Sequence, residues 1–112
     1  MKIIETSKEF TKVEKYLMTM DASIKTIKDV ADDTVIKVAG YLTFVDEKSD
    51  GEVELLSIIT PEKEVYTCQS ATFKTSFHNI AEIMEGDEFA IRKISGTTKA
   101  GRPYVDCALY VE

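Results

Sequence analysis

The sequence predicts a mainly β domain with one or more helices. From residue 34 onward, apolar residues alternate with a period of two in several segments, which is the pattern of half-buried strands. One later segment, residues 73–84, instead repeats its apolar residues at helical spacing. The length of 112 residues and the 44% content of hydrophobic residues are those of one ordinary globular domain.

Residues 1–33 are expected to form an N-terminal extension that packs on the main domain. Within them, five apolar residues at three- and four-residue spacing predict one face of a helix: Phe10, Val13, Tyr16, Leu17 and Met20. Ser7 is a candidate N-cap for this helix. A strand over residues 10–20 is the alternative, because Thr, Val and Tyr are frequent there. A second short helical pattern spans residues 24–30.

Residues 34–112 are expected to form the main domain, whose first strand covers residues 34–44. Four apolar residues share one face of this strand: Ile36, Val38, Leu42 and Phe44. The opposite face carries Lys37, Ala39, Tyr41 and Thr43. Gly40 interrupts the apolar row, which predicts a bend or a bulge.

Four more strands are predicted over residues 53–60, 65–69, 88–95 and 104–111, with the helix of residues 73–84 between the third and fourth strands. In the last strand, Tyr104, Asp106, Ala108 and Tyr110 share one face. The order β-β-β-α-β-β is that of an OB-fold, a partly open five-stranded barrel that binds oligonucleotides or oligosaccharides. Small α+β sheets can share this order.

The charge distribution narrows the choice of partner. The chain has 20 acidic residues against 14 lysines and arginines, for a net charge of −6. Residues 89–105 nevertheless contain no acid and four cations: Arg92, Lys93, Lys99 and Arg102. The negative total therefore does not exclude a nucleic acid, and it limits where a nucleic acid can bind.

The loop of residues 96–102 is the strongest candidate for a binding site. Lys99 and Arg102 lie in a glycine-flanked segment between the last two predicted strands, and Tyr104 follows at once. Cations that neutralise phosphates, next to a ring on which a base stacks, are what single-strand binding requires. The alternative is an exposed hairpin whose charges only aid solubility.

Four further residues are candidates for the same surface. Tyr41 and Lys37 share a face of the first strand, Tyr66 lies on the third strand, and Arg92 lies on the fourth strand. We expect the lysine and arginine side chains to contact phosphates and the tyrosine rings to stack on bases.

The sequence contains no catalytic motif. Cys68 and Cys107 are too few for a disulfide scaffold and lack the spacing of a metal site, and His78 is the only histidine. No phosphate-binding glycine loop or Ser-His-Asp set is present. We therefore expect no enzyme activity, no cofactor and no metal site.

The sequence also favours a cytoplasmic location. No apolar run approaches the roughly 20 residues that cross a bilayer. The first ten residues, MKIIETSKEF, do not follow the pattern of a signal peptide. Two cysteines without the spacing of a disulfide framework or a metal site are typical of a protein in a reducing compartment. We expect no membrane association.

Four stretches resemble small single-stranded DNA-binding proteins of bacteriophages: residues 17–20 (LMTM), 33–35 (DTV) with 40–41 (GY), 67–73 (TCQSATF) and 94–104 (ISGTTKAGRPY). This resemblance implies an OB-fold that coats single strands during phage DNA replication or recombination in the cytoplasm of a bacterial host. Within the family pattern, residues 95–104 correspond to the basic loop, which carries over Lys99, Arg102 and Tyr104.

The sequence thus predicts a non-enzymatic, sequence-tolerant protein that binds single-stranded DNA. A site with so few cations would bind weakly in each protomer, which favours cooperative binding, so we expect a homo-oligomer. We also expect contacts with replication or recombination proteins. The alternative is an acidic protein-interaction module, or a phage structural or accessory protein, that contacts a host or phage protein through the acidic segment of residues 46–54.

Overall fold

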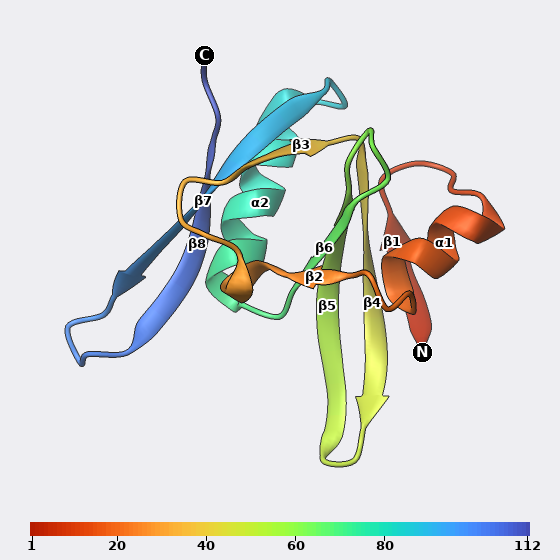
Figure 1. Ribbon diagram of the computed structural model, residues 1–112, viewed down its shortest axis with the longest axis horizontal. Helices are drawn as coiled ribbons and strands as arrows, with labels where there is room; N and C mark the ends of the chain where they lie inside the picture. Colours follow the sequence, from red (N-terminus) through yellow and green to blue (C-terminus); the bar gives the residue numbers. More distant parts are fainter.

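The computed structural model describes residues 1–112, apart from the side chain of Lys48, and confirms the prediction of a mainly β protein with helices (Figure 1). Its strands are β1 (Lys2–Thr6), β2 (Lys25–Thr26), β3 (Val35–Val38), β4 (Gly40–Lys48), β5 (Gly51–Ile59), β6 (Val65–Cys68), β7 (Phe89–Thr97) and β8 (Pro103–Leu109). Its α-helices are α1 (Lys12–Thr19) and α2 (Ala71–Met84), and a short 3-10 helix covers Ile27–Asp29.

The strands form two sheets that do not close into a barrel. The larger sheet has the order β1-β4-β5-β6-β2, and the smaller sheet has the order β3-β7-β8. Neighbouring strands are antiparallel, except that β2 runs parallel to β6. Because β2 occupies the free edge of β6, that edge is not paired with β8.

Residues 1–33 supply β1 and β2 to the larger sheet, and neither strand was predicted. β1 pairs with β4, and the two-residue β2 lies within the segment for which a second helix was predicted. Of that second helix only the short 3-10 turn forms. Helix α1 confirms the helical interpretation of residues 10–20 and rules out the strand there.

The N-cap of α1 is Thr11 and not Ser7. The Thr11 hydroxyl accepts a hydrogen bond from the Glu14 N–H, and the Glu14 carboxylate accepts one from the Thr11 N–H, which is a complete capping box. The Thr11 N–H, together with the nearby Lys63 ammonium, lowers the pKa of Glu14 to about 2. Ser7 instead accepts a hydrogen bond from the backbone N–H of Tyr41, so it ties the N-terminal segment to β4.

The predicted bend occurs between β3 and β4, where the chain leaves one sheet and enters the other (Figure 1). Gly40 lies at this point because the Phe10 ring packs against it: a Cβ there would lie 2.8 Å from two ring atoms. The sheet change splits the predicted apolar row. Ile36 and Val38 enter one core, whereas Leu42 and Phe44 enter another.

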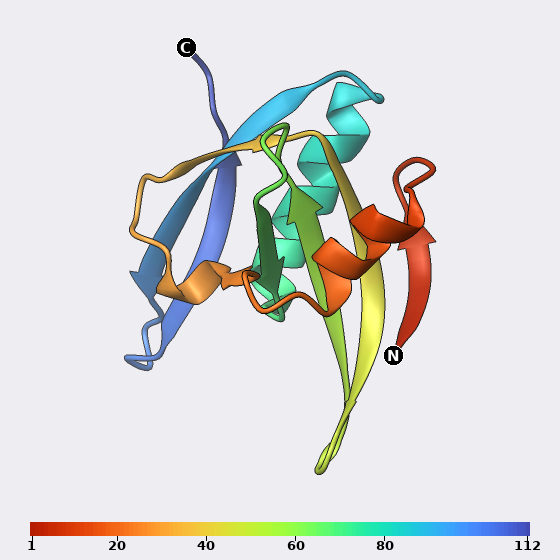
Figure 2. The same cartoon turned by 45° about the vertical axis from the view of Figure 1, so that its right-hand side comes forward.

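Two cores flank the larger sheet. The first lies between the two sheets and is filled by α2, whose Phe73 and Phe77 are fully buried. Helix α2 begins after its N-cap Ser70, whose hydroxyl accepts a hydrogen bond from the Phe73 N–H, and its C-cap Glu85 is followed by Gly86 with φ of 88°. The second core lies between the larger sheet and α1 and includes Met18. Figure 2 shows α1 and α2 on opposite sides of β5.

Candidate nucleic-acid interface

The smaller sheet has one face without a covering helix, which we call the outer face. Between β3 and β7, Lys37 opposes Ala90 and Val35 opposes Arg92. Between β7 and β8, Arg92 opposes Ala108 and Gly96 opposes Tyr104. The full set on this face is Val35, Lys37, Ala90, Arg92, Ile94, Gly96, Tyr104, Asp106 and Ala108. Of the described elements, α2 packs closely on this sheet, and it does so on the inner face.

The contacts of α2 show which face is the inner one. The Cys107 Sγ lies 3.9 Å from the Phe73 carbonyl oxygen, and the Ser70 hydroxyl donates to the Val105 carbonyl at 3.4 Å. Cys107 and Val105 therefore face the helix. Tyr104 and Asp106 alternate with them and face outward, as the sequence predicted.

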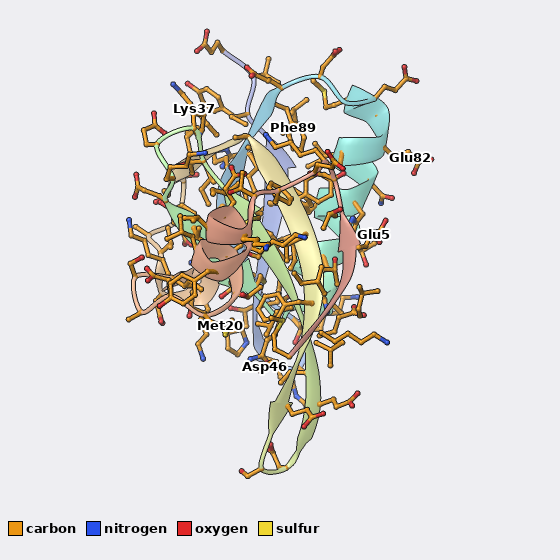
Figure 3. All side chains as sticks on the ribbon, turned by 90° about the vertical axis from the view of Figure 1, so that its right-hand side faces the viewer. Glu5, Met20, Lys37, Asp46, Glu82 and Phe89 are labelled. Atoms are coloured by element: carbon orange, nitrogen blue, oxygen red, sulfur yellow. The ribbon has the colours of Figure 1, made fainter. Side chains whose placement is uncertain are left out.

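The outer face brings together three of the predicted site residues from three different strands. Lys37 lies on β3, Arg92 on β7 and Tyr104 on β8. In Figure 3, Lys37 lies on the other side of the molecule from Glu82 of α2. Because the three residues come from separate parts of the chain, the pairing of the strands, and not their spacing in sequence, places them on one face, with Lys37 and Tyr104 toward its opposite ends.

Lys99 and Arg102 lie in the exposed turn at one end of the outer face. The Thr98 N–H donates to the Arg102 carbonyl at 2.8 Å, and the Thr98 hydroxyl accepts from the Arg102 N–H at 3.1 Å. Gly101 has φ of 82°, a conformation that favours glycine. The backbone of this turn is therefore held by its own hydrogen bonds, while both cationic side chains are exposed.

Tyr104 lies across the backbone of Gly96, the residue opposite it on β7. A Cβ at Gly96 would lie 2.5 Å from the Tyr104 hydroxyl oxygen and 2.7 Å from Cζ. The ring therefore occupies the space that any other residue at position 96 would fill. Because Tyr104 remains 39% exposed, part of its ring surface is open to solvent.

The charges on the outer face are mixed. The Arg92 guanidinium donates to the Asp33 carboxylate at 2.6 Å, and Asp106 lies on the same face opposite Ile94. The unpaired cationic charge is therefore greatest at the two ends of the face, at Lys37 and in the turn that contains Lys99 and Arg102.

Lys93, the fourth cation of the basic segment, is not available to a ligand. It is buried on the inner side of β7, and its ammonium donates to the Val30 carbonyl oxygen at 2.5 Å. It also lies 3.4 Å from the Asp32 carboxylate. The Ser95 hydroxyl, and then Lys93, lower the pKa of Asp32. This lysine fixes the loop before β3.

Tyr41 does not lie on the outer face. Its ring packs edge-on against Phe77 of α2, with 4.9 Å between ring centroids, and burial raises its pKa, with a smaller contribution from Glu5. The sheet change after Val38 is the reason, because it turns Tyr41 toward the core between the sheets and separates it from Lys37.

Tyr66 is only 8% exposed and belongs to the same core. Strand β2 runs beside it, and the Lys25 ammonium lies 5.4 Å from the centroid of its ring. Its ring is therefore not available to stack on a base.

Tyr110 was not selected from the sequence, although the alternation of β8 places it on the same face as Tyr104. Its N–H donates to the Ala90 carbonyl at 2.9 Å, which continues the pairing of β7 and β8 beyond Leu109. Its side chain is 39% exposed. The alternation of residues 104–111 with a period of two already places Tyr110 on the face of Tyr104, and this pattern could have identified it.

The other reactive groups are placed as follows. Cys68 and Cys107 are buried free thiols, and burial, followed by Asp106 and Cys68, raises the pKa of Cys107 to about 12. His78 is exposed on α2. Over the described residues, no three His, Cys, Asp or Glu side chains gather as a metal site would require. In the part of the chain that the structure describes, no helix is long and apolar enough to cross a membrane.

The chain matches no protein-family model, and comparisons with curated proteins and with solved structures likewise give no match.

Proposed function

We propose that this protein binds single-stranded DNA on the outer face, without sequence preference and without enzyme activity. The observation that carries the proposal is the gathering of Lys37, Arg92 and Tyr104 on one uncovered sheet face, with Lys99 and Arg102 at its end. Cations beside an exposed ring on an open surface are the combination that binds a single strand. The bacteriophage resemblance of residues 94–104 adds support, and on that ground we assign the activity to phage DNA replication or recombination in a bacterial host cytoplasm.

The strand connections support an open, OB-like arrangement. If β3 and β4 are taken as one bent first strand, it pairs with both β5 and β7, β5 pairs with β6, β7 pairs with β8, and α2 lies between β6 and β7. These are the pairings of an OB-fold apart from the one that closes the barrel. The face of β5 that meets α1 is covered, because the Ser57 hydroxyl donates to the Met18 carbonyl at 2.7 Å. The outer face of the smaller sheet remains open.

Two kinds of contact would hold the DNA. Lys99 and Arg102 would pair with phosphates, an interaction that weakens as salt rises because bound counterions are released. Tyr104 would stack on a base, which contributes about 1–3 kcal/mol. A site with so few free cations binds weakly on its own. We therefore expect self-association on the strand, and replication or recombination proteins as further partners.

The salt dependence of binding tests this proposal. Anisotropy titrations of labelled dT12 between about 50 and about 300 mM salt give the slope of log K against log salt. Replacing Lys99 or Arg102 with Ala should make the slope less negative by about 0.7 for each phosphate that the protein no longer neutralises. Lys12→Ala, an exposed lysine on α1, is the matched control. Equal slopes for all the variants would refute the assignment of the turn.

A second candidate function rests on the hairpin of β4 and β5. This hairpin extends beyond the body of the protein (Figures 1 and 2), with Asp46 where it leaves the body (Figure 3). Its exposed acids are Glu47, Asp50, Glu52 and Glu54. If the hairpin is the functional surface, its partner is a basic protein. Glu47→Gln with Glu52→Gln would then abolish binding of an octalysine peptide, while Tyr104→Ala would leave that binding unchanged.

A further inference from the structure

The outer face carries a second exposed ring at its opposite end. Tyr110 lies one residue after the end of β8 and six residues after Tyr104, and its N–H continues the pairing with β7, so the alternation places both side chains on the same side of the sheet. Each is 39% exposed. At about 3.3 Å per residue, the two rings are anchored roughly 20 Å apart.

Each ring stands opposite one of the smallest residues of β7. Tyr104 opposes Gly96, and the Tyr110 N–H is bonded to the carbonyl of Ala90. Two outer positions of β7 lie between Ala90 and Gly96: Arg92 opposes Ala108, and Ile94 opposes Asp106. A small residue opposite each ring adds no large side chain beside it, and each ring keeps 39% of its surface exposed, as a stacking platform requires.

A lysine lies in the same row as one ring, and an arginine lies two residues before the other. Lys37 of β3 opposes Ala90 of β7, and the Ala90 carbonyl accepts from the Tyr110 N–H. Lys37, Ala90 and Tyr110 therefore form one row across the smaller sheet. Arg102 precedes Tyr104 by two residues. Each end of the face therefore has one ring and one lysine or arginine, and at the Lys37 end Glu62 and Glu64 also lie nearby.

The centre of the face differs from its ends. Asp106 lies there, and Asp33 neutralises Arg92. These carboxylates repel phosphates, so a strand that crosses the centre would keep its phosphates toward the rim.

We propose that Tyr110 is a second base-stacking platform, so that one protomer holds a single strand at two points, at Tyr104 on β8 and at Tyr110 just after β8. This inference rests on the proposed function. A strand with its bases stacked at about 3.4 Å needs about six nucleotides to cover roughly 20 Å, so the site spans several nucleotides of one strand.

The test uses labelled dT12 and four full-length variants: Tyr110→Ala, Tyr110→Phe, Tyr104→Ala and Tyr16→Ala. Tyr16 is the matched control, because it is 49% exposed but lies on α1. Tyr110→Ala should weaken binding about 5- to 150-fold, the equivalent of one stacked base. Tyr110→Phe retains the ring and should bind as the natural protein does.

Ultraviolet crosslinking to dT12, followed by mass spectrometry of the peptides, gives an independent readout. It should identify both Tyr104 and Tyr110, and a merely structural role for Tyr110 would not produce this crosslink. Thermal melting shows that each variant is folded.

Three results separate the two proposals. Weak binding by Tyr110→Ala, with Tyr16→Ala unchanged, supports the second platform. Equal binding by Tyr110→Ala and Tyr16→Ala, with Tyr104→Ala weakened, overturns the second platform and leaves the proposed function standing. If the natural protein does not bind dT12 at all, the proposed function fails, and the second platform fails with it.

Discussion

Gly96→Ala would remove the support of the Tyr104 ring without touching the ring itself. The new methyl group would lie 2.5 Å from the Tyr104 hydroxyl oxygen and 2.7 Å from Cζ, inside normal contact distance. The Tyr104 ring is part of a rigid side chain, so it must rotate away from β7. Because it is partly exposed, it can move into solvent.

The effects on folding and on binding should therefore differ. An overpacked site loses about 1–3 kcal/mol when it cannot relax, but here the ring can leave. Alanine also recovers about 0.5–1 kcal/mol relative to glycine in a strand. The free energy of unfolding should change by about 1 kcal/mol or less. Binding should lose the contribution of one stacked base, about 1–3 kcal/mol, or 5- to 150-fold in Kd.

Anisotropy titration with dT12 and thermal melting measure the two effects separately. Thr97→Ala, a change at the exposed neighbouring position, is the control. Adding Tyr104→Ala to Gly96→Ala should weaken binding little further, because both changes remove the same stack. If Gly96→Ala binds dT12 as tightly as the natural protein while Tyr104→Ala binds it more weakly, then Gly96 does not hold the ring in its binding position.

Three other predictions concern stability and reactivity. Gly40→Ala should lower the free energy of unfolding by about 1–3 kcal/mol, because the buried Phe10 ring 2.8 Å from the new Cβ cannot leave its core; an unchanged melting temperature would show that the core adapts. The Glu14 pKa, lowered from 4.5 to about 2 on folding, gives stability that is present above pH 4.5 and lost as the pH falls toward 2. The difference in melting temperature between the natural protein and Glu14→Gln should therefore shrink over that range, and a constant difference would disprove the link. With the Cys107 pKa raised to about 12, iodoacetamide at about pH 8 should label this thiol in urea but not in the folded protein, and equal labelling rates would contradict its burial.

Local patterns predicted the elements that depend on local physics. The stripe that includes Phe73 and Phe77 predicted α2 over residues 73–84, and the helix begins only two residues earlier, at Ala71. The alternation in β8 correctly separated Tyr104 from Cys107. Both patterns repeat within one element, so no knowledge of distant residues is needed.

Other features depend on contacts between distant segments and could not be predicted this way. Residues 1–33 show no alternation of apolar and polar residues with a period of two. β1 and β2 form there because they pair with β4 and β6, which lie elsewhere in the chain. The place of Tyr41 depends on the sheet change at Gly40, which reverses the face of every later residue in that row. A predicted bend at Gly40 does not say which sheet the chain enters next.

The sequence predicted only the part of the candidate site that lies within one local segment. Lys99, Arg102 and Tyr104 are neighbours in sequence, so the hairpin pattern alone places them together. Lys37 reaches the same face, at its other end, only through the pairing of β3 with β7. The burial of Lys93 against the Val30 carbonyl is a contact between segments that no count of charges reveals.

Titration of the natural protein with labelled dT12 is the decisive measurement for single-strand binding on the outer face. We expect binding at about 50 mM salt and micromolar protein, and weaker binding as salt rises, because phosphate contacts release counterions. We also expect Tyr104→Ala to weaken binding while the protein remains folded. The absence of any dT12 binding at that salt and protein concentration would contradict the proposed function.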